Sequence, residues 1–260
     1  MRPELVVIRG GGDLATGVAW RLHAAGFPIV VTELANPLTV RRGVALSSAV
    51  QQGEIVIEAQ LTGRRCEIAE AVALARTGVV AVVVLPELEQ LGAAVVVDAR
   101  LAKRNLDTTI NDAALVVGLG PGFTANVDCH AVVETNRGHH LGRVLWAGSA
   151  EADTGQPGEV GGRGAERVLR AAASGAVSWT VDIGDRVGDG QVLGYIATTV
   201  VRSPFAGIVR GLIASGTTVA AATKIGDVDP RADRAGCFQI SDKALAIGGG
   251  VVEAVLVTFA

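Results

Sequence analysis

The sequence is poor in residues that several classes of protein require. Aromatic residues make up 3% of its 260 residues, and no stretch is dense in Lys and Arg. A nucleic-acid-binding protein carries a basic surface and uses aromatic rings for stacking. The formal net charge of −3 also gives no basic surface. We therefore expect no nucleic acid among the partners.

Disulfides and membrane spans are also not indicated. Cys66, Cys129 and Cys237 lie far apart with no C-x-x-C pair, so neither a disulfide framework nor a structural zinc site is expected. The longest apolar run, residues 79–85, is far shorter than the roughly 18 residues of a membrane span. Arg9 interrupts the first apolar stretch, which is too short for a signal peptide. These absences indicate a cytoplasmic protein with reduced thiols.

The sequence is rich in glycine, and its first glycine loop directly follows an apolar strand. Gly10, Gly12 and Ala15 have the G-x-G-x-x-G/A spacing of a dinucleotide-binding turn, in which small residues allow a tight turn and close approach of a phosphate. A helical pattern follows, and Glu33 ends the next apolar strand about 20 residues on, where an acid would bind a ribose. This pattern predicts a βαβ unit of the Rossmann kind.

Asp13 supports a second interpretation of this loop. Its carboxylate would lie at the start of the helix, where it could cap backbone N–H groups and occupy the positive end of the dipole that a pyrophosphate would use. Two alternatives therefore stay open. The loop binds a phosphate, or it serves packing alone with Asp13 as the N-cap.

Three more apolar runs predict parallel strands, and the last enters a second glycine loop at residues 118–123. In a doubly wound sheet, the loops that follow the strands open on one edge. The two glycine loops are therefore expected to face one crevice, with Gly120 and Gly122 on its far wall. Pro121 has no N–H to donate, so an architectural role for this loop also stays open.

Polar residues follow the second loop. Glu134 and Arg137 are candidates for a polar pocket, with an exposed charge pair at a strand end as the alternative. Cys129, His130 and His139 are possible metal ligands, but the sequence has no matching second cluster, so no metal site is expected.

The second half of the chain changes character. Residues 148–165, which include Pro157, are rich in glycine and predict a linker. Residues 166–232 contain short strands between glycine turns, which indicate an all-β module. With the phrases I-G-D-x-V-x-x-G-Q-x-L at residues 183–193 and S-P-x-x-G-x-V at residues 203–209, this segment resembles a biotinyl/lipoyl-type barrel-sandwich domain. No lysine lies between Tyr195 and Arg202, where a carrier domain attaches its cofactor, so we expect a structural or docking role.

The last segment is predicted to be helical. Ser241 is a candidate N-cap, and the glycines at residues 248–250 would disfavour a helix interior. Either two helices meet there, or another backbone passes close. The expected fold is α/β, with a Rossmann-like parallel sheet domain, a linker, a small all-β barrel-sandwich domain and a C-terminal helical segment that packs back on the core, in residues 1–147, 148–165, 166–232 and 233–260.

Several phrases occur in one order along nearly the whole chain, at residues 9–17, 119–123, 134–139, 224–231 and 240–244 with 248–250. With these phrases the chain resembles the accessory or maturation proteins of selenium-dependent molybdenum hydroxylases, the YqeB-like family. The resemblance implies a role in making or activating such a hydroxylase, which would be the client protein. It implies no established reaction.

We therefore expect a maturation factor that holds a phosphate-bearing ligand, either a nucleotide (NAD, FAD or ATP) or a molybdopterin-type cofactor. One alternative is an NAD-dependent oxidoreductase, for which His130 and Cys129 are the candidate acid–base groups. Another is a structural adaptor without chemistry. The sequence leaves open whether a reaction is catalysed and whether the chain forms a homo-oligomer. The residues expected to hold the ligand are Gly10, Gly11, Gly12, Asp13, Glu33, Gly120, Gly122, Glu134 and Arg137.

Overall fold

The computed structural model describes residues 4–86, 91–153, 155, 159, 161–231 and 233–260, and it divides into two compact units. The first unit, here called the sheet unit, comprises Met1–Pro37, Ala45–Thr154 and Ile240–Ala260. The second, the β unit, comprises Leu38–Val44 and Gly155–Gln239. The β unit is thus inserted in the chain of the sheet unit. Residues 1–3 lie outside the described residues, and so does Pro157, which belongs to the expected linker.

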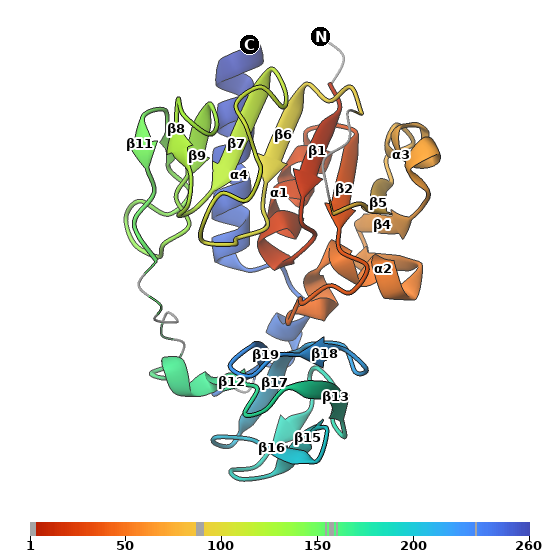
Figure 1. Cartoon of the computed structure of the whole chain (residues 1–260), viewed down its shortest axis with the longest axis vertical. Coiled ribbons are helices and arrows are strands. Elements are labelled where there is room, and N and C mark those ends of the chain that lie inside the picture. The colour runs from red at the N-terminus through yellow and green to blue at the C-terminus, as the bar shows by residue number, and fades with distance from the viewer. Residues whose placement is uncertain (1–3, 87–90, 154, 156–158, 160, 232) are drawn as a thin grey trace. The chain divides into compact units, whose positions relative to one another are not determined.

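The sheet unit is built on one large sheet (Figure 1). Its strands are β1 (Val6–Arg9), β2 (Ile29–Glu33), β3 (Glu54–Ile57), β4 (Leu61–Arg65), β5 (Val80–Val84), β6 (Val95–Asp98), β7 (Leu115–Leu119), β9 (Ala131–Val133) and β10 (Val144–Leu145). The nine strands have the order β10-β9-β7-β6-β1-β2-β5-β4-β3. All neighbours from β9 to β4 are parallel, and the edge strands β10 and β3 pair antiparallel. Their valine-rich sequences suit strands that are covered on both faces.

The expected fold class, a Rossmann-like parallel sheet domain plus a biotinyl/lipoyl-like barrel-sandwich domain, is wrong. The large sheet is mixed, since both of its edges are antiparallel. A doubly wound sheet also has a helix in each crossover, whereas residues 99–114, between β6 and β7, form turns and no helix. This segment is rich in Asp, Asn and Thr, whose side chains bond nearby backbone and favour turns.

Four α-helices are described, namely α1 (Asp13–Ala24), α2 (Ala49–Gln52), α3 (Ile68–Ala75) and α4 (Asp242–Phe259). In α1 Gly12 is the N-cap, and the chain leaves the helix through Gly26, whose φ of +87° suits a residue without a side chain. In α4 the Ser241 hydroxyl accepts a hydrogen bond from the Ala244 N–H, as expected of an N-cap.

Helix α4 is continuous through its glycines and lies alongside α1, with both helices running in the same direction (Figure 1). A Cβ atom added to Gly248 would overlap the carbonyl oxygen of Gly17 in α1, and one added to Gly250 would overlap the carbonyl oxygen of Gly142. The glycines of α4 are therefore places where neighbouring backbone passes close. The two helices start at the same edge of the sheet.

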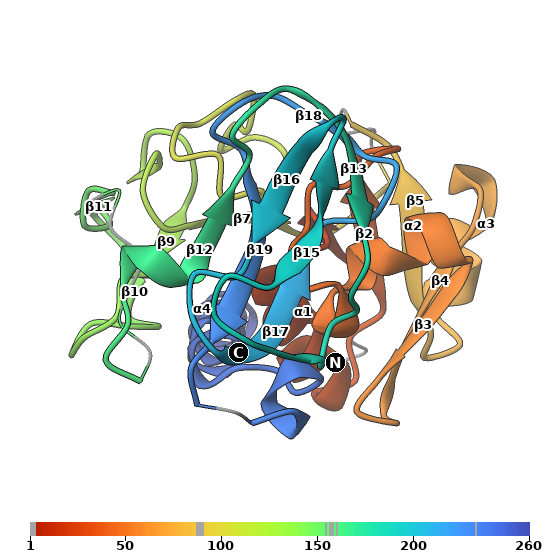
Figure 2. The ribbon, with the colours of Figure 1, turned by 90° about the horizontal axis from the view of Figure 1, so that it is seen from below.

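The remaining strands of the sheet unit, β8 (Thr124–Ala125) and β11 (Gly148–Ser149), form a small antiparallel pair. The β unit contains two antiparallel sheets of four strands each, and Figure 2 shows them from the side of β15 and β16. One has the order β12-β19-β17-β14 and the other β16-β15-β13-β18. Their bounds are Val168–Arg170 (β12), Gly175–Trp179 (β13), Arg186–Val187 (β14), Val192–Ile196 (β15), Thr199–Arg202 (β16), Gly207–Leu212 (β17), Thr218–Val219 (β18) and Lys224–Asp229 (β19).

Both sheets of the β unit contribute to one apolar core. Val177 and Leu193 come from one sheet, and Val209 and Ile225 from the other. This unit also contains short 3₁₀ helices at Arg42–Val44, Ala165–Arg167 and Ala235–Cys237, and the sheet unit has one at Leu46–Ser48.

Candidate functional site

The carboxyl ends of the parallel strands bring the two glycine loops to one edge of the sheet unit. Strand β6 lies between β1 and β7 and is parallel to both. The loop after β1 and the loop after β7 are therefore on the same edge, with the end of β6 between them. Ligands of open α/β sheets bind outside this edge.

The first glycine loop is held by its own protein neighbours. Gly10 has a φ of +89°. The Gly11 N–H donates to Glu33 Oε2 at 2.8 Å, and the Gly11 oxygen accepts from the Ser47 N–H at 2.8 Å. The other carboxylate oxygen of Glu33 accepts from the Leu34 N–H at 2.7 Å. Glu33, expected to bind a ribose, thus occupies the Gly11 amide in this structure.

The start of α1 differs from the expectation in one detail. Gly12 is the N-cap and Asp13 is the first helical residue, so Asp13 does not take the N-cap position. The Gly12 oxygen accepts the first helical hydrogen bonds, from the N–H and the hydroxyl of Thr16.

The glycines of the second loop are explained by close packing. Gly120 and Gly122 have φ values of +74° and +108°. A Cβ atom on Gly120 would lie 3.2 Å from Thr135 Cγ2 and overlap its hydroxyl, and one on Gly122 would lie 2.6 Å from the Arg104 backbone. The Gly120 N–H donates to the Val133 oxygen at 2.9 Å. Both loops thus have an architectural reason for their glycines.

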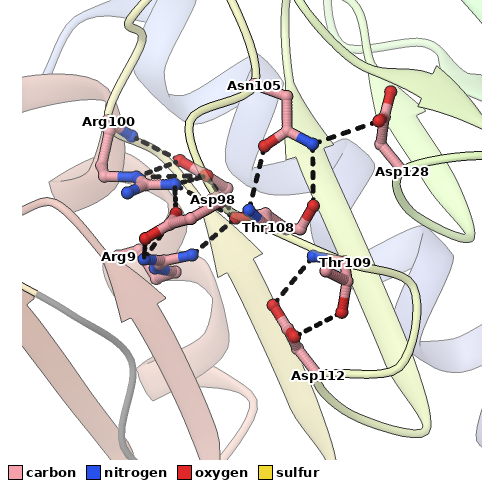
Figure 3. A network of polar contacts seen from close by, with 9 residues as sticks. Arg9, Asp98, Arg100, Asn105, Thr108, Thr109, Asp112 and Asp128 are labelled. Atoms are coloured by element: carbon pink, nitrogen blue, oxygen red, sulfur yellow. Dashed lines mark hydrogen bonds and ion pairs between the residues drawn. The ribbon is translucent and has the colours of Figure 1, made fainter.

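A network of charged side chains lies at the ends of β1 and β6 (Figure 3). The Arg9 side chain, 1% exposed, donates to Thr108 Oγ1 at 2.7 Å and to Asp107 at 2.9 Å. The Thr108 hydroxyl donates to Asp98 Oδ2 at 2.6 Å. Arg100 donates to the same oxygen at 2.6 Å and also to Asp107 Oδ1 at 2.6 Å. Two arginines and two aspartates therefore neutralise one another where the strand order reverses.

The charged groups of this network are paired with one another, and this pairing affects their pKa values. Hydrogen bonds from Arg9, and then from Arg100, hold the pKa of Asp107 below its usual value despite some burial. Asn105 anchors the turn, since its amide donates to the Thr108 oxygen at 2.7 Å and to Asp128 at 3.1 Å. The sequence analysis did not identify this network. The sequence signal for this network is that each of two otherwise apolar strands ends in a charged residue, Arg9 in β1 and Asp98 in β6.

Glu134 is a buried carboxylate, 2% exposed, directly after β9. One of its oxygens accepts from the N–H groups of Thr135 and Asn136 at 2.7 and 2.6 Å, and the other accepts from the Glu151 N–H at 2.7 Å. These donors satisfy the carboxylate within the protein. Glu134 thus orders the segment that carries Arg137 and leaves little capacity for a ligand.

Basic side chains gather where α1 and α4 start. Arg137 pairs with Asp242, the first residue of α4, through two hydrogen bonds of 2.9 and 3.1 Å. Burial lowers the pKa of the neighbouring Lys243, and the positive charges of Arg137 and Lys103 lower it further, whereas Asp13 raises it. Among the described residues, Lys243 has no hydrogen bond or ion pair. We call Lys103, Arg137 and Lys243 the basic cluster.

The basic cluster was only partly expected from the sequence. Arg137 was a candidate, but Lys103 and Lys243 were not, and only the packing of α4 along α1 brings Lys243 to this edge. The cluster combines positive side chains with two helix N-termini, where backbone N–H groups and the helix dipole favour an anion.

The cysteines and histidines do not form a chemical site. All three cysteines are free thiols, and burial raises the pKa of Cys129 to about 11. His130 Nδ1 accepts a hydrogen bond from the Val116 N–H at 3.0 Å. In the part of the chain that the structure describes, no group of three or more His, Cys, Asp or Glu side chains is placed to hold a metal ion.

A pocket of about 480 Å³ lies at the opposite edge of the sheet, where β1, β2 and β5 begin. Its lining includes Glu4, His23, Pro28 and Arg76. It is therefore separate from both glycine loops. None of the helices within the described residues has both the length and the apolar character needed to cross a bilayer.

Comparison with known proteins identifies one relative by sequence. The chain is 46% identical over 256 residues to the uncharacterized protein YqeB of Escherichia coli K12. The aligned part covers 97% of this chain and 47% of YqeB, so the chain spans about half the length of the curated relative that it matches. The relative supports the YqeB part of the expected resemblance and assigns no function. No family model matches the chain.

Two solved structures are similar at low TM-score. The ectoine utilization protein EutE (DoeB) from Ruegeria pomeroyi matches at 12% identity and a TM-score of 0.24, covering 86% of this chain and 57% of that one. A succinylglutamatedesuccinylase/aspartoacylase from Rhodobacter sphaeroides matches at 18% identity and 0.23, covering 85% and 51%. In sequence, the chain is thus similar to YqeB. Its fold consists of the mixed sheet of the sheet unit and the two antiparallel sheets of the β unit.

Proposed function

We propose that this chain is a cytoplasmic accessory factor for a selenium-dependent molybdenum hydroxylase, and that it binds a small phosphate-bearing ligand at the carboxyl edge of its large sheet. The ligand is a nucleotide or a molybdopterin-type cofactor. The first part of the proposal rests on the family resemblance of the sequence phrases. The second rests on the basic cluster.

The single observation that carries the ligand-binding proposal is the state of Lys243. Its ammonium is partly buried beside two other cations, which lowers its pKa, and it makes no hydrogen bond to a described residue. An ammonium group has three donors, and no described residue accepts a hydrogen bond from the one of Lys243. A bound anion would supply acceptors and offset the repulsion from Arg137 and Lys103.

The helices add to this attraction. Lys243 lies in the first turn of α4, where a positive side chain opposes the helix dipole. The first turn of α1 starts at the same edge. A phosphate near both helix starts would interact favourably with both dipoles, each by roughly 0.3–1 kcal/mol. A bound anion would thus account for the position of Lys243 in the first turn of α4, where a positive side chain is otherwise unfavourable.

The glycine loops therefore have a different role from the ligand binding that the sequence led us to expect. The Gly11 amide is occupied by Glu33, and Gly120 and Gly122 are packed against Thr135 and Arg104. The loops shape the edge of the sheet, and side-chain cations supply the binding energy. Because Glu33 already holds two backbone N–H groups, the geometry does not favour the NAD-dependent oxidoreductase.

Binding is tested by calorimetric titration of the full chain with NAD, FAD, ATP and molybdopterin. At least one of these ligands should bind, and Lys243→Gln should weaken its binding tenfold or more, which is about 1.4 kcal/mol. Arg64→Gln is the matched control, because it removes one positive charge from an exposed site on β4 of the same sheet. If no ligand binds, or if Lys243→Gln binds as the unaltered chain does, the ligand-binding proposal is wrong.

The client is tested separately. The accessory role predicts that the tagged chain retains a molybdenum hydroxylase on co-purification from cells that make one. The β unit is the expected docking part, so the interaction should persist in Lys243→Gln. Absence of the hydroxylase from the purified complex, together with full hydroxylase activity in cells without this chain, would contradict the accessory role.

A further inference from the structure

The β unit contains a second cluster of charges, in a different part of the chain from the basic cluster. Asp227 and Asp229 lie on β19, and Arg210 lies on the paired strand β17. Arg167, just before β12, and Arg231, just after β19, complete what we call the arginine–aspartate cluster. Two aspartates and one arginine of this cluster lie in the phrase at residues 224–231.

Each aspartate already has one close arginine. Arg167 Nη1 donates to both carboxylate oxygens of Asp227, at 2.5 and 2.6 Å. Arg231 donates to Asp229 through Nε at 3.0 Å and through Nη2 at 2.7 Å, and its backbone N–H donates at 2.9 Å. Burial alone would raise the pKa of Asp229, but the Arg231 bonds outweigh it and the net shift is downward. Both carboxylates therefore have strong partners without Arg210.

Arg210 is the additional cation. Its guanidinium lies 3.8 Å from Asp227 and 3.8 Å from Asp229, beyond hydrogen-bond distance from both. Its side chain is only 13% exposed, and it makes no hydrogen bond to a described residue. A guanidinium has five N–H donors, so Arg210 has donors that neither aspartate occupies. Burial lowers the pKa of Arg210, and the charge of Arg41 lowers it further.

The charges around Arg210 do not balance. Arg41 lies near Arg210 and donates through Nη2 to the oxygens of Gly236 and Gln239. The arginine–aspartate cluster itself has three guanidinium groups and two carboxylates, so it has one arginine more than it has aspartates. A phosphoryl group carries about 1.5 to 2 negative charges at pH 7 and three acceptor oxygens. Its geometry also suits the planar fork of an arginine.

We infer that Arg210 is the anchor of a second anion site, in the β unit, which binds a dianionic phosphoryl group. Arg41 contributes positive charge, and the two aspartates keep the neighbouring arginines in place. The ligand is inorganic phosphate or the terminal phosphate of a larger molecule. This site does not depend on the basic cluster, because it uses residues of the other unit.

The test is a calorimetric titration of the full chain with inorganic phosphate and, separately, with the phosphomonoester AMP. We expect binding that Arg210→Gln weakens tenfold or more. Arg186→Gln is the matched control, since Arg186 is exposed on β14, the other neighbour of β17 in the sheet. Arg210→Lys keeps the positive charge and serves as a second variant in case Arg210→Gln does not fold. It should fold normally and bind more weakly than the unaltered chain, because it lacks the bidentate fork.

The outcomes separate this site from the proposed function. Equal binding of both probes identifies phosphate itself as sufficient, and binding of AMP alone identifies a phosphate on a larger molecule. If neither probe binds to the unaltered chain, or if folded Arg210→Gln and Arg210→Lys bind like the unaltered chain, the inference is wrong. If Lys243→Gln abolishes phosphate binding and Arg210→Gln does not, the anion site is the basic cluster, and only the inference about the β unit fails.

Discussion

The contact between α1 and α4 predicts opposite effects for the same substitution at neighbouring residues. Gly248 and Gly249 both lie inside α4, where glycine is less favourable than alanine by about 1 kcal/mol. A Cβ atom on Gly249 would meet nothing within 4 Å. Gly249→Ala is therefore expected to raise the free energy of unfolding by about 0.5–1 kcal/mol.

Gly248→Ala should do the reverse. Its Cβ would overlap the Gly17 oxygen and lie 2.9 Å from the Gly17 carbonyl carbon. Backbone atoms inside a helix have no alternative rotamer, so α1 and α4 would have to move apart. Overpacking of this kind costs about 1–3 kcal/mol. Set against the gain in helix propensity, the net loss is as much as about 2 kcal/mol.

The measurement is urea unfolding followed by tryptophan fluorescence. Trp20 and Trp146 belong to the sheet unit and Trp179 to the β unit, so a Trp179→Phe background makes the signal report on the sheet unit. Both variants gain the same helix propensity, so they should differ by the overpacking cost of about 1–3 kcal/mol, with Gly249→Ala the more stable. Equal stabilisation by both would show that α1 and α4 do not approach at Gly17, and the description of this contact would be wrong.

Three further predictions follow from single groups. Glu33→Ala leaves two backbone N–H groups without their acceptor, so it should lower the free energy of unfolding by about 1–3 kcal/mol. We expect NAD binding to be unchanged. A loss of NAD affinity without a loss of stability would instead indicate that Glu33 binds a ribose. At pH 8 a thiol reagent should modify Cys66 first and Cys129 and Cys237 only after unfolding, because burial raises the pKa of all three thiols but only Cys129 and Cys237 are fully shielded. Mass spectrometry counts the modified thiols, and prompt labelling of Cys129 would contradict its burial. The pKa of Lys243 is lower in the folded than in the unfolded chain, so its charge disfavours folding below the folded pKa, and this cost fades as pH rises to the ordinary lysine value. Lys243→Gln should therefore raise the melting temperature at pH 7 and have less effect at pH 10, and ligand binding should weaken with rising pH earlier than for an ordinary lysine; a lower melting temperature at pH 7 would refute this.

The strands and loops that depend on local pattern were predictable. The valine run at residues 79–85 predicts a covered parallel strand, and β5 occupies Val80–Val84 between β2 and β4. Gly10 and Gly120 end strands with positive φ, as glycines in tight turns do. These features follow from a few neighbouring residues.

The features that depend on packing between distant segments were not predictable. The role expected for Glu33 assumed a ligand, whereas the structure shows its carboxylate bonded to the loop after β1. Lys243 carries no local signal, and it joins Arg137 only because α4 lies along α1. Arg9 and Asp98 lie opposite each other because β1 and β6 are neighbours in this register, which one sequence does not reveal.

The insertion of the β unit has a consequence for synthesis on the ribosome. Helix α1 is complete at Ala24, and its partner α4 begins only at Asp242. At about 5–20 residues per second, roughly ten to forty seconds pass between the two. During this time the Gly17 side of α1 has no partner, while synthesis of the β unit, which ends at Gln239, is completed before α4 begins. We therefore expect the β unit to fold first, and the sheet unit to be the part of the nascent chain that chaperones protect.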